Sequence, residues 1–93
     1  RNGRGAKGGA SVNREFVEVM NDLRAERERQ DRKWGEQNHG DSRWLAILME
    51  EIGEACAAGL QGRPDADVEY ELIQSTAVLV AWLECKKRRR SRG

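Results

Sequence analysis

Carboxylate side chains gather at two points of the sequence where the surrounding residues are largely apolar. Glu50, Glu51 and Glu54 lie within five residues of one another, and Glu71 follows in an even more apolar segment. The pairs Glu51–Glu54 and Glu71–Gln74 share the i, i+3 spacing that places two side chains on one face of a helix. If the two helices are antiparallel neighbours, we expect Glu51, Glu54, Glu71 and Gln74 to converge.

A carboxylate in an apolar setting costs free energy unless a partner compensates its charge. Residues 67–85 contain no Lys or Arg, so a divalent cation is the natural partner. Oxygen ligands suit Mg²⁺, with Mn²⁺ as the alternative, and the lack of His and Cys among the candidates argues against Zn²⁺. Two other interpretations remain open: a solvated acidic face, and ion pairs of these carboxylates with Arg27 or Arg43.

Three segments have helical patterns, so we predict an all-α fold. The first helix is expected over residues 12–34, where seven residues lie within about 60° of the direction of Phe16 at the 100° helical step. The first half of this stripe is apolar and the second half is polar, which is typical of a helix that leaves a core and enters a cleft or solvent. The stripe consists of Phe16, Val19, Met20, Leu23, Arg27, Gln30 and Trp34.

The second helix is expected over residues 43–60. Asp41 or Ser42 is predicted to cap its start, and the glycines before Pro64 are predicted to end it. Glu51 is expected to lie beside the core-facing stripe of this helix. That stripe is predicted to consist of Leu45, Leu48, Ile52, Ala55 and Cys56.

The third helix, expected over residues 67–85, has apolar residues all round its axis. Between Leu72 and Leu83 only Gln74, Ser75 and Thr76 are polar. A helix of this kind is buried on every side, which three helices of one small chain cannot achieve. We therefore expect a helical bundle completed by oligomerisation, as a homodimer or homotetramer.

Both ends of the chain are basic and its middle is acidic. Residues 11–85 hold all sixteen acids and only eight of the seventeen bases. We predict a flexible basic arm over residues 1–10, a folded domain over residues 11–85, and a basic tail over residues 86–93 that is disordered beyond its first turn. The tail has no aromatic residues between its bases, so a nucleic-acid partner is not expected.

The cysteines and the hydropathy of the chain predict a cytoplasmic protein. No apolar run approaches the length of a membrane span, and no signal-peptide pattern opens the sequence, so no membrane partner is expected. Cys56 and Cys85 have no CxxC spacing and lie on predicted apolar faces. We predict that both are buried, reduced thiols in a reducing compartment.

Residues 14–85 resemble the MazG-like, all-α NTP pyrophosphohydrolases, in particular their short, phage-type members. The resemblance is carried by the run RERQDRKWG at residues 27–35, by Glu50-Glu51-Ile52-Gly53-Glu54, and by Glu71-Leu72-Ile73-Gln74. The family pattern is EExxE followed after a short spacer by ExxD. Gln74 occupies the position of the family's Asp, which removes one negative charge from the expected metal site.

The resemblance implies hydrolysis of a nucleoside triphosphate between its α- and β-phosphates, giving a monophosphate and pyrophosphate. It implies Glu51, Glu54 and Glu71 as Mg²⁺ ligands and Gln74 as a neutral fourth ligand. Glu50 and Glu51 are then the candidate catalytic residues, with Glu50 acting as a base, as a group behind the ligands, or as a ligand of a second ion.

Substrate contacts are expected from the polar end of the first helix and the loop after it. Basic side chains there would hold phosphates, Trp34 would stack on a base unless it serves only packing, and amide side chains would read the edge of the base. The candidates are Arg27, Gln30, Lys33, Trp34, Asn38 and Arg43. Because Gln74 weakens the expected metal site, the alternative function is a non-catalytic helical module that binds a nucleotide or a protein.

Overall fold

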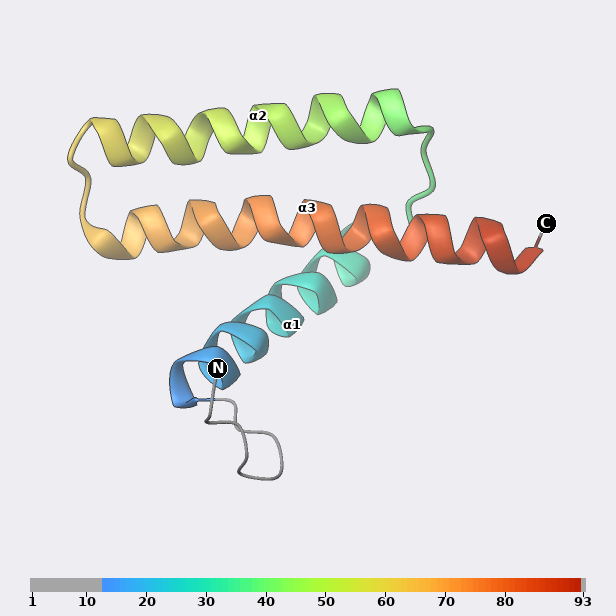
Figure 1. Ribbon diagram of the computed structural model, residues 1–93, viewed down its shortest axis with the longest axis horizontal. Coiled ribbons are helices and arrows are strands. Elements are labelled where there is room, and N and C mark those ends of the chain that lie inside the picture. The colour runs from blue at the N-terminus through green and yellow to red at the C-terminus, as the bar shows by residue number, and fades with distance from the viewer. Residues whose placement is uncertain (1–12, 93) are drawn as a thin grey trace, which may run out of the picture.

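The computed structural model describes residues 13–92, which form three α-helices (Figure 1). Helix α1 spans Arg14–Trp34, α2 spans Asp41–Leu60, and α3 spans Asp65–Arg92. No strand occurs within these residues, and the predicted all-α class is confirmed. The arm predicted for residues 1–10 lies outside the described residues. None of the described helices is long and apolar enough to cross a membrane.

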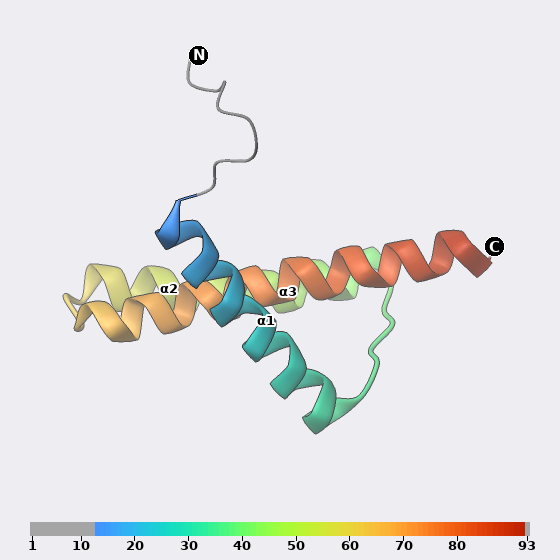
Figure 2. The same cartoon turned by 90° about the horizontal axis from the view of Figure 1, so that it is seen from below.

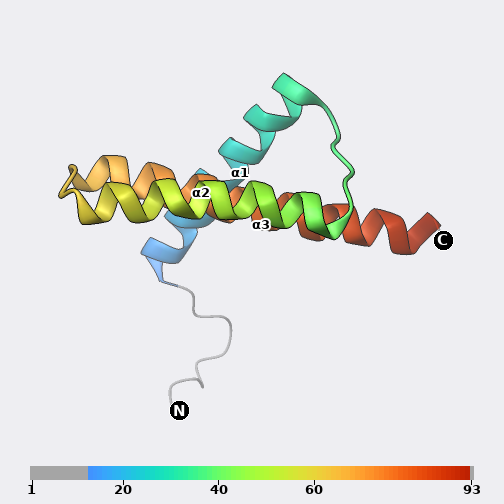
Figure 3. The ribbon, with the colours of Figure 1, turned by 90° about the horizontal axis from the view of Figure 1, so that it is seen from above.

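Helices α2 and α3 form an antiparallel hairpin, and α1 crosses α3 on the side away from α2 (Figures 1 and 2). The view from above shows α2 in front of α3, with α1 passing behind at a steep angle (Figure 3). Helix α3 is therefore the central element and contacts both of the others. The hydrophobic core lies between α2 and α3. Its members are Trp44, Leu48, Val78 and Cys85, with Ile47, Ala81 and Trp82 packed against them.

Local signals fix both ends of α1. The Asn13 side chain accepts a 2.7 Å hydrogen bond from the Phe16 amide, which caps the first turn. At the other end, the Gly35 amide donates to the Asp31 carbonyl at 2.8 Å. Gly35 has φ = 74°, a conformation that side chains disfavour. The chain therefore leaves α1 sharply and enters the loop that leads to α2.

The predicted side-chain cap of α2 is wrong. Gly40 is the N-cap residue and offers no side chain, so that both Asp41 and Ser42 lie inside the first turn. The Asp41 carboxylate instead accepts hydrogen bonds from Trp82 Nε1 at 2.9 Å and from Lys86 Nζ at 3.1 Å. It joins the start of α2 to the far half of α3 and holds the open end of the hairpin together.

The predicted core stripe of α2 is wrong for three of its five members. Leu45 and Ile52 are 50% and 38% exposed, and Cys56 is exposed as well, contrary to the prediction that it is buried. Helix α2 has two apolar faces roughly 100° apart at the 100° helical step. Helix α3 covers the face that contains Trp44 and Ala58, and the other face points away from it. Cys85 is buried, as predicted.

The basic tail is helical to Arg92, not disordered beyond its first turn. Its bases have local partners that reduce their mutual repulsion. Lys86 pairs with Asp41 at 3.1 Å, and both Arg88 and Arg92 lie within 4 Å of Glu36 Oε2. Cations in the last turn of a helix also interact favourably with the helix dipole. The prediction of disorder counted like charges and missed the acids that the fold brings beside them.

Candidate metal centre and the adjoining cavity

Three carboxylates from two helices meet inside the α2–α3 hairpin. Glu51 and Glu54 come from α2 and Glu71 comes from α3. One oxygen from each lies within 4.8 Å of the others, and these three are the candidate metal group found among the described residues. Glu51 and Glu71 are half-buried, and Glu54 is exposed. The predicted convergence is confirmed for these three side chains.

The negative charge of this cluster has no basic partner among residues 13–92. None of the three carboxylates takes part in a salt bridge there. Burial raises the pKa of Glu51 above its ordinary value. Repulsion from Glu54, Glu71, Glu50 and Glu26 raises it further. Besides burial, the raised pKa of Glu51 thus reflects nearby negative charge that the described side chains do not offset.

The ion-pair alternative with Arg27 or Arg43 does not hold within the described residues. Arg27 instead pairs with Asp31 and with Glu84 on α3, and Arg43 forms no salt bridge with the cluster. Burial alone would lower the pKa of Arg27, but the hydrogen bond and charge of Glu84, followed by those of Asp31, raise it overall. This guanidinium is already neutralised by its own partners.

The side chains of the cluster fit a hard divalent cation. They offer carboxylate oxygens only, the type of ligand that Mg²⁺ and Mn²⁺ prefer. Gln74 is close by, since it lines the same cavity as Glu51, and among residues 13–92 its buried Nε2 has no hydrogen-bond partner. Gln74 also helps to lower the pKa of Glu26, although the contact lacks ordinary hydrogen-bond geometry. A turn of this amide about its last bond would present its oxygen in place of Nε2.

A cavity of about 420 Å³ opens beside the cluster, a volume within the range of small-molecule sites. Helix α1 supplies its polar half to one wall, as the change of character along the α1 stripe predicted. Helices α2 and α3 supply the opposite wall, which includes Trp44, Glu51 and Gln74. Of the predicted substrate contacts, the cavity is lined by Arg27, Gln30 and Trp34.

The other predicted contacts are not among the residues that line the cavity. Lys33 Nζ lies 4.7 Å from the ring centroid of Trp34, so a cation and an exposed aromatic ring stand together at the end of α1. Asn38 donates to Glu36 and accepts from Arg88, so its side chain holds the loop together. Glu50 is exposed on α2, and Arg43 does not line the cavity.

No family model, curated protein or solved structure matches this chain. The resemblance to MazG-like enzymes therefore stays a prediction. The function has to be argued from the cluster and the cavity themselves.

The sequence analysis did not identify three residues of this region as candidate site residues. Glu26 is 9% exposed and lies close enough to Glu51 to affect its pKa. Trp44 is 2% exposed and lines the cavity. Arg88 also lines the cavity and binds the loop through Asn38 and the Gln37 carbonyl, the latter at 2.9 Å. Glu26 follows Leu23 by three residues and precedes Gln30 by four, a spacing that could have revealed it.

Proposed function

We propose that this chain is a Mg²⁺-dependent nucleoside triphosphate pyrophosphohydrolase, with Mn²⁺ as an alternative ion. Its products are a nucleoside monophosphate and pyrophosphate. The observation that carries the proposal is the meeting of Glu51, Glu54 and Glu71 without a basic partner in the described part of the chain, at the edge of a cavity that has aromatic and cationic walls. The resemblance of residues 27–35, 50–54 and 71–74 to MazG-like enzymes supports the same reaction.

In this proposal, Glu51, Glu54 and Glu71 hold the ion, with the Gln74 amide oxygen as a fourth ligand. When bound, the ion supplies the positive charge that neutralises the phosphates and polarises the bond to be broken. Glu50 takes the proton from the attacking water. It is suited to this because it is exposed and next to Glu51.

The far part of the cavity holds the nucleoside. Trp34 is 54% exposed and offers a ring face for stacking on a base. Gln30 lines the same wall and reads the edge of the base. Lys33, whose Nζ lies 4.7 Å from the ring centroid of Trp34, supplies a positive charge for the phosphates. Arg27 orients Gln30 through a 3.0 Å hydrogen bond, so it positions a substrate contact while its own charge is matched by Glu84. Asn38 contributes by fixing the loop.

The test is an assay of pyrophosphate release with Mg²⁺ over the common ribo- and deoxyribonucleoside triphosphates. We expect turnover of at least one of them, and loss of that turnover in Glu51→Gln and in Glu71→Gln. Glu28→Gln is the matched control, because Glu28 is an exposed carboxylate that forms no salt bridge within the described residues. No release from any substrate, or equal release by wild type and Glu51→Gln, contradicts the proposal.

A second candidate is a helical module that binds a nucleotide or a protein without hydrolysing it. Gln74 favours this candidate, because an amide gives the cluster one negative charge fewer than the acid expected there. Tight nucleotide binding without turnover, unchanged in Gln74→Asp, supports the binding module. Turnover that appears or rises in Gln74→Asp supports the enzyme.

We also propose a cytoplasmic homo-oligomer, a dimer or a tetramer. Its support is the amount of apolar surface that one chain leaves exposed. Leu45 and Met49 on α2 and Leu72 and Leu83 on α3 are each at least half exposed. Soluble monomers rarely expose large contiguous apolar patches.

A further inference from the structure

Helix α3 presents an exposed apolar stripe on the side that neither α1 nor α2 covers. Leu72, Leu79 and Leu83 are 52%, 42% and 60% exposed, and Thr76 lies between them. The four positions follow one another at spacings of four, three and four residues. This is the spacing of the a and d positions in a coiled coil, where each helix faces a partner helix along one seam. The described part of the chain supplies no such partner.

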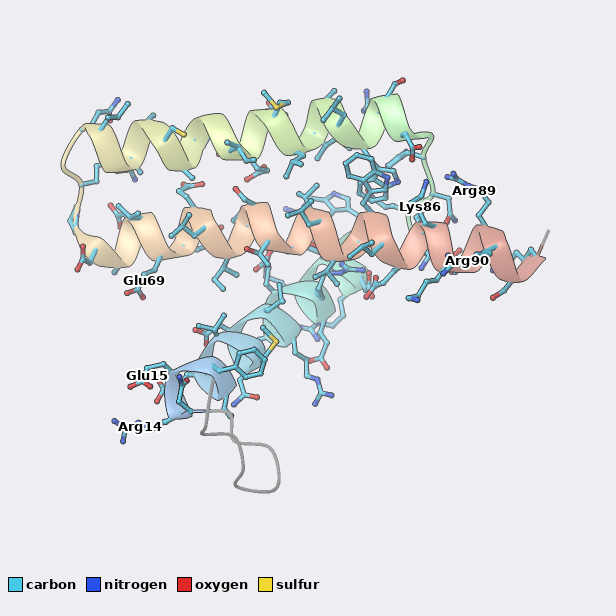
Figure 4. All side chains as sticks on the ribbon, in the orientation of Figure 1. Arg14, Glu15, Glu69, Lys86, Arg89 and Arg90 are labelled. Carbon is cyan, nitrogen blue, oxygen red and sulfur yellow. The ribbon has the colours of Figure 1, made fainter. Side chains whose placement is uncertain are left out.

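Charged residues continue the same spacing at both ends of the stripe. Asp65 and Glu69 precede Leu72, and Lys86 and Arg90 follow Leu83, so that eight consecutive positions keep the four–three alternation. Figure 4 labels Glu69, Lys86 and Arg90 toward opposite ends of α3. The seam is therefore acidic at its amino end, apolar in its middle and basic at its carboxyl end.

The charges at the two ends of this seam are largely free to pair with something else. Within residues 13–92, Asp65, Glu69 and Arg90 take part in no salt bridge, and neither does Lys87 beside them. The other bases of the tail behave differently. Those with bonds to the loop or to α2 are Lys86, Arg88, Arg89 and Arg92.

We propose that a second copy of this chain packs on this face, with its α3 antiparallel to the first. The sequence of the seam is self-complementary about a point between Thr76 and Leu79. An antiparallel copy centred there sets Leu72 against the partner's Leu83 and Thr76 against the partner's Leu79. It also sets Asp65 against the partner's Arg90. Glu69 then lies near two bases of the partner, Lys86, which Asp41 of its own chain already holds at 3.1 Å, and the neighbouring Lys87, which forms no salt bridge within the described residues. A parallel copy would set each of these charges against its own kind, which is unfavourable.

The apolar residues of α2 that the chain leaves exposed extend this face. By helical phase, Leu45 and Ile52 lie about 100° from the residues that face α3, on the side away from the cavity. They are 50% and 38% exposed. Two α2–α3 hairpins that pack against each other on this side form a four-helix bundle with a shared apolar interior. The cavity is left open, because its walls lie on the opposite side of the hairpin.

Charge exchange tests the arrangement and its direction. The first variant is Asp65→Lys with Glu69→Lys, and the second is Lys87→Glu with Arg90→Glu. Either variant places like charges at both ends of an antiparallel pair, and we expect its dimer dissociation constant to rise on the order of a hundredfold. The variant with all four changes, and an equimolar mixture of the first two variants, are expected to recover most of the association. Lys86 is left unchanged because it pairs with Asp41. Mass is measured by sedimentation, and helicity by circular dichroism.

Arg32→Glu is the control, because Arg32 is exposed on α1 and away from the seam. A wild-type chain that stays monomeric overturns the proposal. So does unchanged association of either half-exchanged variant, or failure of the four-change variant to associate while it keeps wild-type helicity. If one half-exchanged variant does not fold, the other still decides the question. The readout is mass without nucleotide or metal, so the outcome is independent of the proposed hydrolysis.

Discussion

Glu26 and Glu51 are two carboxylates of the same interior whose pKa values move in opposite directions. Glu26 is 9% exposed and accepts two hydrogen bonds from Arg29, at 3.0 and 2.7 Å, and one from Gln30 at 3.0 Å. The Arg29 hydrogen bonds lower the pKa of Glu26 and outweigh its burial. The pKa of Glu51 is raised by its burial and, further, by repulsion from the carboxylates around it, and no hydrogen bond from a basic residue offsets these effects within residues 13–92.

The comparison shows that burial alone does not set the pKa of a carboxylate, because the hydrogen bonds and charges of its neighbours can outweigh burial or add to it. Glu26 is satisfied by residues three and four positions along its own helix, so it contributes to the folded state without a ligand. Glu51 gains stabilising contacts only if something positive is added. Glu26 is thus satisfied within its own helix, whereas Glu51 is a carboxylate that we propose binds an ion, and substitutions should affect the two in opposite ways.

The largest expected contrast is in the response to Mg²⁺. Wild type at a hundred times the dissociation constant for Mg²⁺ should gain about 2.7 kcal/mol of unfolding free energy, and Glu51→Gln should lose this gain. Glu51→Gln should also lower kcat/KM roughly a thousandfold, because the ion contributes several kcal/mol to the transition state. Thermal unfolding with and without Mg²⁺, together with pyrophosphate release, measures both effects. A wild-type Mg²⁺ response in Glu51→Gln would remove the proposed difference between the two carboxylates.

The next effect is on stability in the absence of Mg²⁺. Glu26→Gln should lower the free energy of unfolding by about 1–2 kcal/mol, because it removes charge-assisted hydrogen bonds inside the bundle. Glu51→Gln should leave this free energy unchanged or raise it, because it relieves repulsion in the cluster. Urea unfolding monitored by circular dichroism measures the difference. Glu18→Gln is the control and should have almost no effect, since Glu18 is exposed and lies 3.9 Å from Arg14.

Sequence reasoning was sufficient for the fold class and for the acidic cluster. Three helices follow from the 3.6-residue periodicity, and a short turn between the second and third makes them antiparallel. Glu51, Glu54 and Glu71 then face each other, because the i, i+3 spacing and the hairpin leave little freedom. The periodicity in α1 also indicated where its residues leave the core and reach a cavity.

Sequence reasoning failed where the local sequence pattern supported two arrangements of a helix equally. Helix α2 has apolar residues on two faces, and periodicity cannot say whether Leu45 or Trp44 meets α3. The prediction that the basic tail is disordered failed for a different reason. Arg88 and Lys86 are neutralised by Glu36 and Asp41, which are about fifty residues away along the chain. Local repulsion is visible in a sequence, whereas the partners that offset it are fixed by the fold.

A smaller effect is expected from Gln74→Asp. The change adds a carboxylate beside Glu51, so we expect Mg²⁺ affinity to rise about tenfold, which corresponds to roughly 1.4 kcal/mol. The same change should lower stability without Mg²⁺, because it adds repulsion to a cluster that already raises the pKa of Glu51. Calorimetric titration with Mg²⁺ measures the affinity, and Gln30→Asp serves as a control at another cavity position. Weaker Mg²⁺ binding in Gln74→Asp would show that the amide is not beside the ion.

The smallest expected effect is the dependence of stability on pH without Mg²⁺. The pKa of Glu51 is higher in the folded chain than its ordinary value of 4.5, so the folded state binds this proton more tightly. The contribution of Glu51 to the free energy of unfolding is therefore fully present below its pKa in the unfolded chain, and it is lost as the pH rises through its pKa in the folded chain. Glu26, whose pKa is lowered in the folded chain, stabilises the fold above its pKa in the unfolded chain and loses that contribution as the pH falls through its folded pKa.

Unfolding free energies measured across this acidic range test both signs. On raising the pH, Glu51→Gln should lose less unfolding free energy than wild type. On acidification, Glu26→Gln should lose less than wild type. Saturating Mg²⁺ should reverse the wild-type trend around Glu51, because the ion binds the ionised carboxylate and competes with the proton.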